Sequence, residues 1–158
     1  MNLLIIGAGQ YGMVAKEIAI ELGYKDVAFL DDNSSLAIGK ISDVDKFDGD
    51  VIIAIGNSYV RETQINHLLS FNRLVTLISP HAYVSPSAKI NSGCIIEPMA
   101  VVHTGAKIGN GCIISAGAVV NHGCVLEDFC HIDCNATVMK SAVVPKGTKI
   151  ESNTSFSA

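Results

Sequence analysis

The segment AVVHTGAKIGNGCIISAGAVVNHGCVLEDFCHI, from Ala100 to Ile132, shows a repeat of six residues. A large apolar residue recurs at every sixth position, and a small residue stands two positions before each of them. The large positions are Val84, Ile90, Ile96, Val102, Ile108, Ile114, Val120, Leu126, Ile132, Val138, Val144, Ile150 and Phe156. The small positions are Ala82, Ala88, Cys94, Ala100, Ala106, Cys112, Ala118, Cys124, Cys130, Ala136, Ala142, Thr148 and Thr154. This regularity predicts that one structural unit repeats along the second half of the chain.

A period of six residues fits neither an α-helix nor a flat sheet, and it is typical of a parallel β-helix wound from short strands. The large residue fills the coil, and the small residue points inward near a corner. Glycines just before the small position, such as Gly111 and Gly123, allow the turn without Cβ strain. A β-sandwich of short strands is the alternative, but a sandwich has no reason to hold a fixed period. Since three hexapeptides close one coil, residues 18 apart should stack. One expected inner ladder is Val84, Val102, Val120, Val138 and Phe156.

The first part of the chain alternates predicted strands and helices, which indicates a small parallel sheet. We expect strands at 3–6, 27–30, 51–55 and 74–78, and a loop at 33–50. One helix should follow the first strand with Val14, Ile18 and Leu22 on its buried face, and another should cover 59–70. The pair Ser79-Pro80 is the expected boundary, because Pro resists continuing a central strand. The predicted domains are therefore a Rossmann-like α/β domain over 1–79 and a β-helix over 80–158.

The segment GAGQYG, from Gly7 to Gly12, lies between the first predicted strand and helix. Glycines there allow close backbone approach, and a helix N-terminus favours an anion such as a phosphate. The acidic pair Asp31-Asp32 follows the second predicted strand, near the spacing at which a carboxylate meets a ribose. About four strands are too few for a full dinucleotide fold, so a mononucleotide, such as the uridine part of a nucleotide sugar, fits better. A tight turn without any ligand is the alternative.

The composition narrows the class of partner. The chain has 158 residues and a formal net charge of −4, without a basic stretch, so nucleic acid is an unexpected partner. No apolar run approaches the ~18 residues of a membrane span, and the N-terminus lacks the basic start of a signal peptide, so we expect a cytoplasmic protein. All five cysteines lie in the repeat, and Cys134 alone stands outside the small inward series. This pattern argues against a disulfide framework and against a zinc site.

The combination of motifs resembles a known family. The second strand ends in FLDD, the third in AIGN, a junction reads ISPHAYVSPSA, and the repeat contains VVNHGCVLEDFCHI. Together they resemble the bacterial sugar acetyltransferases of the PglD/NeuD type along essentially the whole chain. The resemblance implies a left-handed β-helix and a homotrimer with active sites between subunits. It also implies transfer of acetyl from acetyl-CoA to the amino group of a UDP-linked 4-amino sugar in bacterial glycan biosynthesis.

The resemblance further implies roles for individual residues. His122 matches the catalytic base, and His131 matches a second histidine that contacts the thioester region of acetyl-CoA. The expected nucleotide-sugar contacts are Gly9, Gln10, Tyr11, Asp31, Asp32, Gly56 and Asn57.

Three departures from the family pattern bear on these roles. The family usually has His where this chain has Tyr11, which alters a polar contact to the sugar or its phosphates. It often has Glu directly after the catalytic His, where Gly123 stands here. Family members also continue for a further coil or two and finish in a GVPA segment that helps to hold coenzyme A. This sequence ends at Ala158 without that segment, so we expect CoA binding to be weak or differently built, or lost.

Chemistry alone supports a histidine base. Acetyl transfer requires an amine or hydroxyl to lose a proton as it attacks a thioester, and histidine is suited to accept it near neutral pH. His122 and His131 should point away from the packed interior and could meet across a subunit groove, so we expect direct transfer without an acetyl-enzyme.

His103 should stand about one coil from His122, which raises the hypothesis of a metal site as in β-helical carbonic anhydrases, although the spacing of the histidines differs. We expect structural roles for His67 and His81.

Three other functions stay open at this point. The acceptor atom leaves little trace in a sequence, so O-acetylation of a sialic acid or another sugar is one alternative. A nucleotide-sugar-binding β-helix protein that has lost CoA binding is the second. An NAD-dependent oxidoreductase is the third, although it rests on the Gly-rich turn alone.

Overall fold

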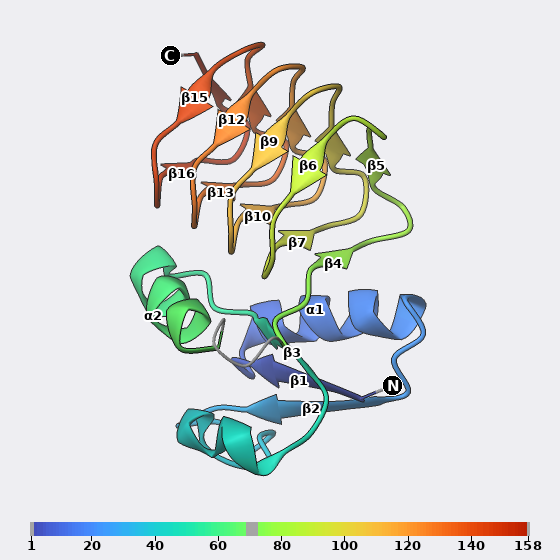
Figure 1. The fold of residues 1–158 in the computed structure, drawn as a ribbon, viewed down its shortest axis with the longest axis vertical. Helices are drawn as coiled ribbons and strands as arrows, with labels where there is room; N and C mark the ends of the chain where they lie inside the picture. Colours follow the sequence, from blue (N-terminus) through green and yellow to red (C-terminus); the bar gives the residue numbers. More distant parts are fainter. Residues whose placement is uncertain (1, 69–72, 158) are drawn as a thin grey trace.

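The computed structural model describes residues 2–68 and 73–157 and shows an α/β domain beneath a β-helix (Figure 1). The α/β domain is built on a parallel sheet with strand order β2-β1-β3. Its strands are β1 (Asn2–Ile6), β2 (Asp26–Leu30) and β3 (Asp50–Ile53). Its helices are α1 (Gln10–Glu21), α2 (Ser58–Leu68) and the 3₁₀ helix η1 (Ile41–Lys46). The predicted Rossmann-like order is confirmed, and η1 adds structure where a loop was expected.

The predicted fourth strand of the α/β domain is wrong. Leu74 makes only an isolated bridge to Val51, and β4 (Leu77–Ile78) pairs with Ile95–Ile96 in the β-helix. The pattern misled because the hydrophobic run 74–78 is continuous across the junction of the two parts. In the structure, the first strand of the β-helix, β4, begins at Leu77. The predicted domain boundary after residue 79 stays a prediction.

The buried face of α1 also differs from the expected one. The helix buries Gly12, Ala15, Ile18 and Ala19, whereas Leu22 is 40% exposed. Small residues are needed there because α1 packs closely against the sheet: a Cβ at Gly12 would lie 2.2 Å from the carbonyl oxygen of Gly7. The second helix is described as far as Leu68, and its predicted last two residues lie outside the described part of the chain.

The β-helix consists of two-residue strands that form three parallel sheets. The strand orders are β16-β13-β10-β7-β4, β17-β14-β11-β8-β5 and β15-β12-β9-β6. The remaining strands are β5 (Tyr83–Val84), β6 (Lys89–Ile90), β7 (Ile95–Ile96), β8 (Val101–Val102), β9 (Lys107–Ile108), β10 (Ile113–Ile114), β11 (Val119–Val120), β12 (Val125–Leu126), β13 (His131–Ile132), β14 (Thr137–Val138), β15 (Val143–Val144), β16 (Lys149–Ile150) and β17 (Ser155–Phe156).

The inner ladder follows the predicted interval of 18 residues. Val120 pairs with Val102 on one side and Val138 on the other, and the ladder continues to Val84 and Phe156. The large and small inward positions from Cys94 to Val144 are buried in one continuous core. The predicted fold class, an α/β domain followed by a left-handed β-helix of hexapeptide repeats, is confirmed.

The sheet containing β7, β10 and β13 faces the α/β domain, as Figure 1 shows. Its outward side chain Ile95 is fully buried in the same hydrophobic cluster as Ile18 of α1. On the α2 side, Ile65 and Leu68 share a cluster with Phe129 of the β-helix. The two parts therefore share apolar contacts along the lower face of the coils.

From Cys94 onward, the corner residue before each small position adopts a left-handed backbone conformation. Glycines occupy many of these corners, and the others are Met99, Phe129, Asn135, Ser141 and Asn153. The space at Gly111 is tight, because an added Cβ would lie 2.6 Å from Ile65 Cδ1 and 2.7 Å from Phe129 Cδ1. At Gly105 the same added Cβ meets nothing within 4 Å.

These two corners allow backbone strain to be separated from crowding. Gly105→Ala should lower the free energy of unfolding by about 1–2 kcal/mol, the cost of a left-handed alanine. Gly111→Ala should cost about 1–3 kcal/mol more, because it also overpacks the contact with α2. Chemical denaturation of both variants checks this, and equal losses at the two corners would contradict the tight packing at Gly111.

Candidate active site

The Gly-rich turn lies at the carboxyl edge of the three-stranded sheet. Gly7 has a φ of +103°, and a Cβ there would lie 2.8 Å from the Ala54 carbonyl oxygen. Gly9 is the N-cap of α1 without a side-chain cap, and an added Cβ at this residue would meet nothing within 4 Å. Gly9 and Gln10 are both exposed, so the helix N-terminus is open to an anion in this chain.

The two carboxylates of the acidic pair after β2 have different hydrogen-bond partners. The Asp31 carboxylate accepts hydrogen bonds from the backbone N–H groups of Ala8 (2.8 Å), Asn33 (2.8 Å) and Ser34 (3.1 Å). These bonds, the one from Ala8 first, lower the pKa of Asp31. Asp32 is exposed and accepts one bond, from the Ile41 N–H at 3.1 Å. Asp31 therefore shapes the turn, and Asp32 has the more accessible carboxylate.

The end of β3 lies at the same edge of the sheet. The Asn57 side chain accepts a hydrogen bond from the Val60 N–H at 3.1 Å, so it caps the first turn of α2. Gly56 is exposed, with nothing within 4 Å of an added Cβ, and its carbonyl oxygen accepts a bond from Arg61. Parallel topology thus brings Gly9, Gln10, Asp32 and Gly56 to one edge. Their contact with a nucleotide sugar, together with that of Asp31 and Asn57, stays a prediction.

Tyr11 directs its hydroxyl away from that edge. The hydroxyl is buried in the junction between the two parts of the chain and makes no hydrogen bond with the described residues. Burial first, and then the neighbouring Glu97 carboxylate, raise the pKa of the Tyr11 phenol. In this arrangement the Tyr11 hydroxyl lies near Glu97 of the β-helix. A substrate role for Tyr11 stays a prediction.

Glu97 is the buried acid of this junction, with 7% of its surface exposed. Its carboxylate accepts the Ala116 N–H at 3.0 Å. Burial raises the pKa of Glu97, and the hydrogen bond from the Ala116 N–H opposes this only in part. The ionised form of Glu97 is therefore less stable in the folded protein than in the unfolded chain.

Replacing Glu97 by glutamine should raise the melting temperature near neutral pH. An acid whose pKa is raised by folding stabilises the folded state below its unfolded pKa, and this contribution is lost as the pH rises through the folded pKa. The advantage of Glu97→Gln should therefore shrink toward about pH 4, where the native glutamate is protonated. Melting curves at both pH values check this, with exposed Glu17→Gln as the matched control. An advantage independent of pH would contradict the assignment.

His131 lies on the outer side of β13, close to the same junction. Its Nε2 lies 3.1 Å from Ser115 Oγ and 3.9 Å from Asp133 Oδ1, and its side chain is 17% exposed. Burial lowers the pKa of His131, although Asp133 opposes the effect. The imidazole is therefore neutral near pH 7 and partly open to a ligand. Its contact with acetyl-CoA stays a prediction.

His122 stands in the turn after β11 and is exposed. Its backbone N–H and its Nδ1 both lie 2.8 Å from Asn121 Oδ1. The ring of His103, one coil away, lies 5.9 Å from the His122 ring between centroids at an interplanar angle of 64°. Over residues 2–68 and 73–157, no group of three His, Cys, Asp or Glu side chains is arranged to hold a metal ion. Both histidines of the pair are exposed, and the role of His122 as the catalytic base stays a prediction.

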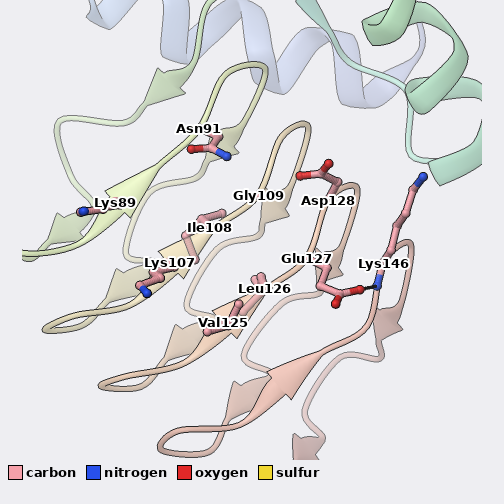
Figure 2. A pocket seen from close by; sticks show the side chains of 10 residues that line it. All are labelled: Lys89, Asn91, Lys107, Ile108, Gly109, Val125, Leu126, Glu127, Asp128 and Lys146. Atoms are coloured by element: carbon pink, nitrogen blue, oxygen red, sulfur yellow. Dashed lines mark hydrogen bonds between the residues drawn. The ribbon is translucent and has the colours of Figure 1, made fainter.

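The predicted base His122 and the predicted acetyl-CoA contact His131 lie on different faces of the prism. His131 belongs to the sheet with β10 and β16, whereas His122 follows β11 of the neighbouring sheet. A shallow groove of about 460 Å³ lies along the third sheet and the turns that follow β9 and β12 (Figure 2). It is lined by residues that include Lys89, Lys107 and Glu127, and it contains neither histidine.

Sequence reasoning missed several residues of the junction. Arg61 is fully buried, and its guanidinium donates to carbonyl oxygens of both parts of the chain. Glu97 and Ser115 come between the repeat positions and have no motif around them. Asn121 directly precedes His122. The available sequence signal was that a short amide side chain can accept a hydrogen bond from the backbone N–H of the next residue.

The fold defines a hexapeptide-repeat β-helix protein with an N-terminal Rossmann-like α/β domain. Residues 2–68 match the family model described as the PglD N-terminal domain, and residues 87–122 match that of the bacterial transferase hexapeptide (six repeats). The two matches confirm the resemblance to the PglD/NeuD type in both parts of the chain. None of the helices in the described ranges has the length and apolar character needed to cross a membrane.

Solved structures show the same arrangement. The acetyltransferase domain of PglB from Neisseria gonorrhoeae FA1090 has a TM-score of 0.84 and 29% identity, over 98% of this chain and 87% of that one. The same domain in complex with acetyl coenzyme A has a TM-score of 0.78 and 29% identity, over 98% and 86%. PerB from Caulobacter crescentus, in complex with CoA and GDP-perosamine, has a TM-score of 0.77 and 21% identity, over 99% and 92%, and supports the fold alone.

Proposed function

We propose that this protein is an acetyl-CoA-dependent N-acetyltransferase that acts on the amino group of a nucleotide-linked sugar. The observation that carries the proposal is His122, an exposed imidazole at a coil corner with its Nδ1 held by Asn121. The PglB acetyltransferase domain, similar over 98% of this chain, has been solved with acetyl coenzyme A, which supports acetyl-CoA as the co-substrate. The open helix N-terminus at Gly9 suits the phosphates of the acceptor.

The chemistry requires few groups. The sugar amine attacks the thioester carbonyl carbon, and His122 Nε2 accepts the proton that the amine loses. The carbon–sulfur bond then breaks, and CoA leaves as the thiol after it takes a proton. A backbone N–H stabilises the oxyanion, and binding both substrates in one groove supplies orientation worth up to ~7–11 kcal/mol in favourable cases. Transfer is direct, so neither a serine nor a cysteine nucleophile is needed.

The separation of His122 and His131 supports a homotrimer with shared active sites. Within one chain the two histidines lie on different sheets of the prism. A site that uses both therefore combines His122 of one copy with His131 of a neighbour. The α/β domain of one of these copies binds the nucleotide sugar beside the intersubunit groove that holds these two histidines.

The groove on the third sheet supports a place for the CoA phosphates. Lys89 and Lys107 are direct partners on adjacent strands, and both side chains are exposed (Figure 2). Two ammonium groups one coil apart suit a diphosphate. The neighbouring Lys146 is already paired with Glu62 of α2 at 2.5 Å, so it is less available. This site is built from the coils themselves and does not require a C-terminal GVPA segment.

The acceptor we propose is a UDP-linked 4-amino sugar of bacterial glycan biosynthesis. The experiment is to incubate the protein with acetyl-CoA and a panel of UDP- and GDP-linked amino sugars, together with a sialic acid, and to follow free thiol release. Release that requires a UDP-linked amino sugar is the expected result. Release only with the sialic acid would indicate O-acetylation. Absence of release from folded protein that still binds a nucleotide sugar would indicate a binding protein without CoA chemistry.

A further inference from the structure

The orientation of the Asn121 side chain is fixed by a backbone group. The amide oxygen and nitrogen of an asparagine look alike in shape, and only their partners tell them apart. The backbone N–H of His122 lies 2.8 Å from the atom assigned as Asn121 Oδ1. Because a backbone N–H can only donate, the atom that faces it must be the oxygen and not the NH₂ group.

The same oxygen then fixes the tautomer of His122. His122 Nδ1 lies 2.8 Å from Asn121 Oδ1, which can only accept. Nδ1 must therefore carry the proton in this contact. In a neutral imidazole only one ring nitrogen is protonated, so Nε2 carries the lone pair.

His103 is fixed in the opposite sense. The backbone N–H of Thr104 donates to His103 Nδ1 at 2.9 Å, so this nitrogen is unprotonated and the proton of the neutral ring is on Nε2. The two rings are neighbours, with centroids 5.9 Å apart. One ring thus exposes a proton acceptor, and the adjacent ring exposes a donor.

We propose that Asn121 is a positioning residue that holds His122 as the Nδ1–H tautomer, so that Nε2 accepts the proton of the sugar amine. The proposal deepens the proposed function and rests on it. Position 123 is a glycine, so no carboxylate follows the histidine, and the neutral amide of Asn121 supplies orientation without a charge. His103 is held in the tautomer that cannot compete as a base through Nε2.

The tautomers can be measured directly by long-range ¹H–¹⁵N NMR of protein labelled with ¹⁵N-histidine, at a mildly alkaline pH. His122→Gln and His103→Gln assign the two signals. The expected wild-type result is a protonated Nδ1 in His122 and a protonated Nε2 in His103. Asn121→Ala should move the His122 proton toward Nε2, whereas Asn121→Asp, which keeps an acceptor oxygen, should preserve the wild-type pattern.

Exposed Asn66→Ala on α2 is the matched control and should leave both ring signals unchanged. An identical His122 pattern in wild type and Asn121→Ala would overturn the proposal. This readout does not depend on turnover, so a wild-type protein without acetyl transfer would refute the proposed function and leave the tautomer assignment standing.

The kinetic result completes the test. Asn121→Ala should lower kcat roughly tenfold, a part of the ~10²–10⁴ that a positioned general base contributes, while KM for both substrates stays within about twofold. Asn121→Asp should recover most of the rate. A changed tautomer with unchanged kcat would overturn the positioning role, because the proton acceptor would then not be His122 Nε2. Circular dichroism melts confirm that each variant is folded.

Discussion

Replacing His122 by alanine should lower kcat for acetyl transfer by about 10²–10⁴-fold, the contribution of a positioned general base. The side chain is exposed at a coil corner and outside the apolar core, so its removal leaves the inner ladder untouched. The melting temperature should therefore stay within a degree or two of the wild type. Steady-state kinetics by thiol release, together with a melting curve, check both parts of this prediction.

His81→Ala is the matched control for this variant. His81 is also exposed, and its nearest acid is Glu21 at 3.8 Å, so no role in proton transfer is expected. A normal rate in His122→Ala would place the base elsewhere in the molecule. An equal loss in both variants would indicate a general effect of removing a surface histidine.

Arg61 should be the polar side chain that contributes most to stability. It is fully buried and donates to the carbonyl oxygens of Ile55 (2.8 Å) and Gly56 (2.9 Å) in the α/β domain. It also donates to the carbonyl oxygens of Gly111 (2.6 Å) and Phe129 (2.8 Å) in the β-helix. One guanidinium thus joins the end of β3 to two corners of neighbouring coils.

Arg61→Met should lower the free energy of unfolding by about 3–5 kcal/mol, because it leaves buried carbonyl oxygens without donors. Arg61→Lys should be intermediate, since an ammonium lacks the planar fork that reaches several carbonyls at once. Chemical denaturation measures both losses. The control is Lys46→Met, whose side chain is 73% exposed beside Asp43 and should cost less than about 1 kcal/mol. A loss for Arg61→Met as small as the control's would show that the carbonyls find other partners.

The repeat could be predicted from the sequence because its cause is local. Each large inward residue, such as Val120, meets its equivalents 18 residues away in both directions, so the packing rule reappears in every coil. Glycine could mark only some of the corners. Met99 adopts the same left-handed conformation, and no rule of composition singles it out.

The junction could not be predicted because its contacts join residues far apart in the sequence. Tyr11 lies in a Gly-rich turn that predicts a ligand contact, yet tertiary packing places its hydroxyl beside Glu97. The run 74–78 has the composition of a strand in either part of the chain, and only pairing with Ile95–Ile96 assigns β4 to the β-helix. For the candidate site, the sequence predicted roles for His122 and the edge at Gly9, and these roles stay predictions. The atoms that surround each residue became visible only in the structure.

The most direct measurement is a crystal structure of the assembled protein with CoA bound. We expect His122 of one copy to face the groove to a neighbouring copy, with Nε2 within hydrogen-bond reach of the space beside the CoA sulfur, and His131 of the neighbour to line the same space. A structure in which CoA binds away from every subunit contact, with His122 facing bulk solvent, would contradict the proposed shared active site.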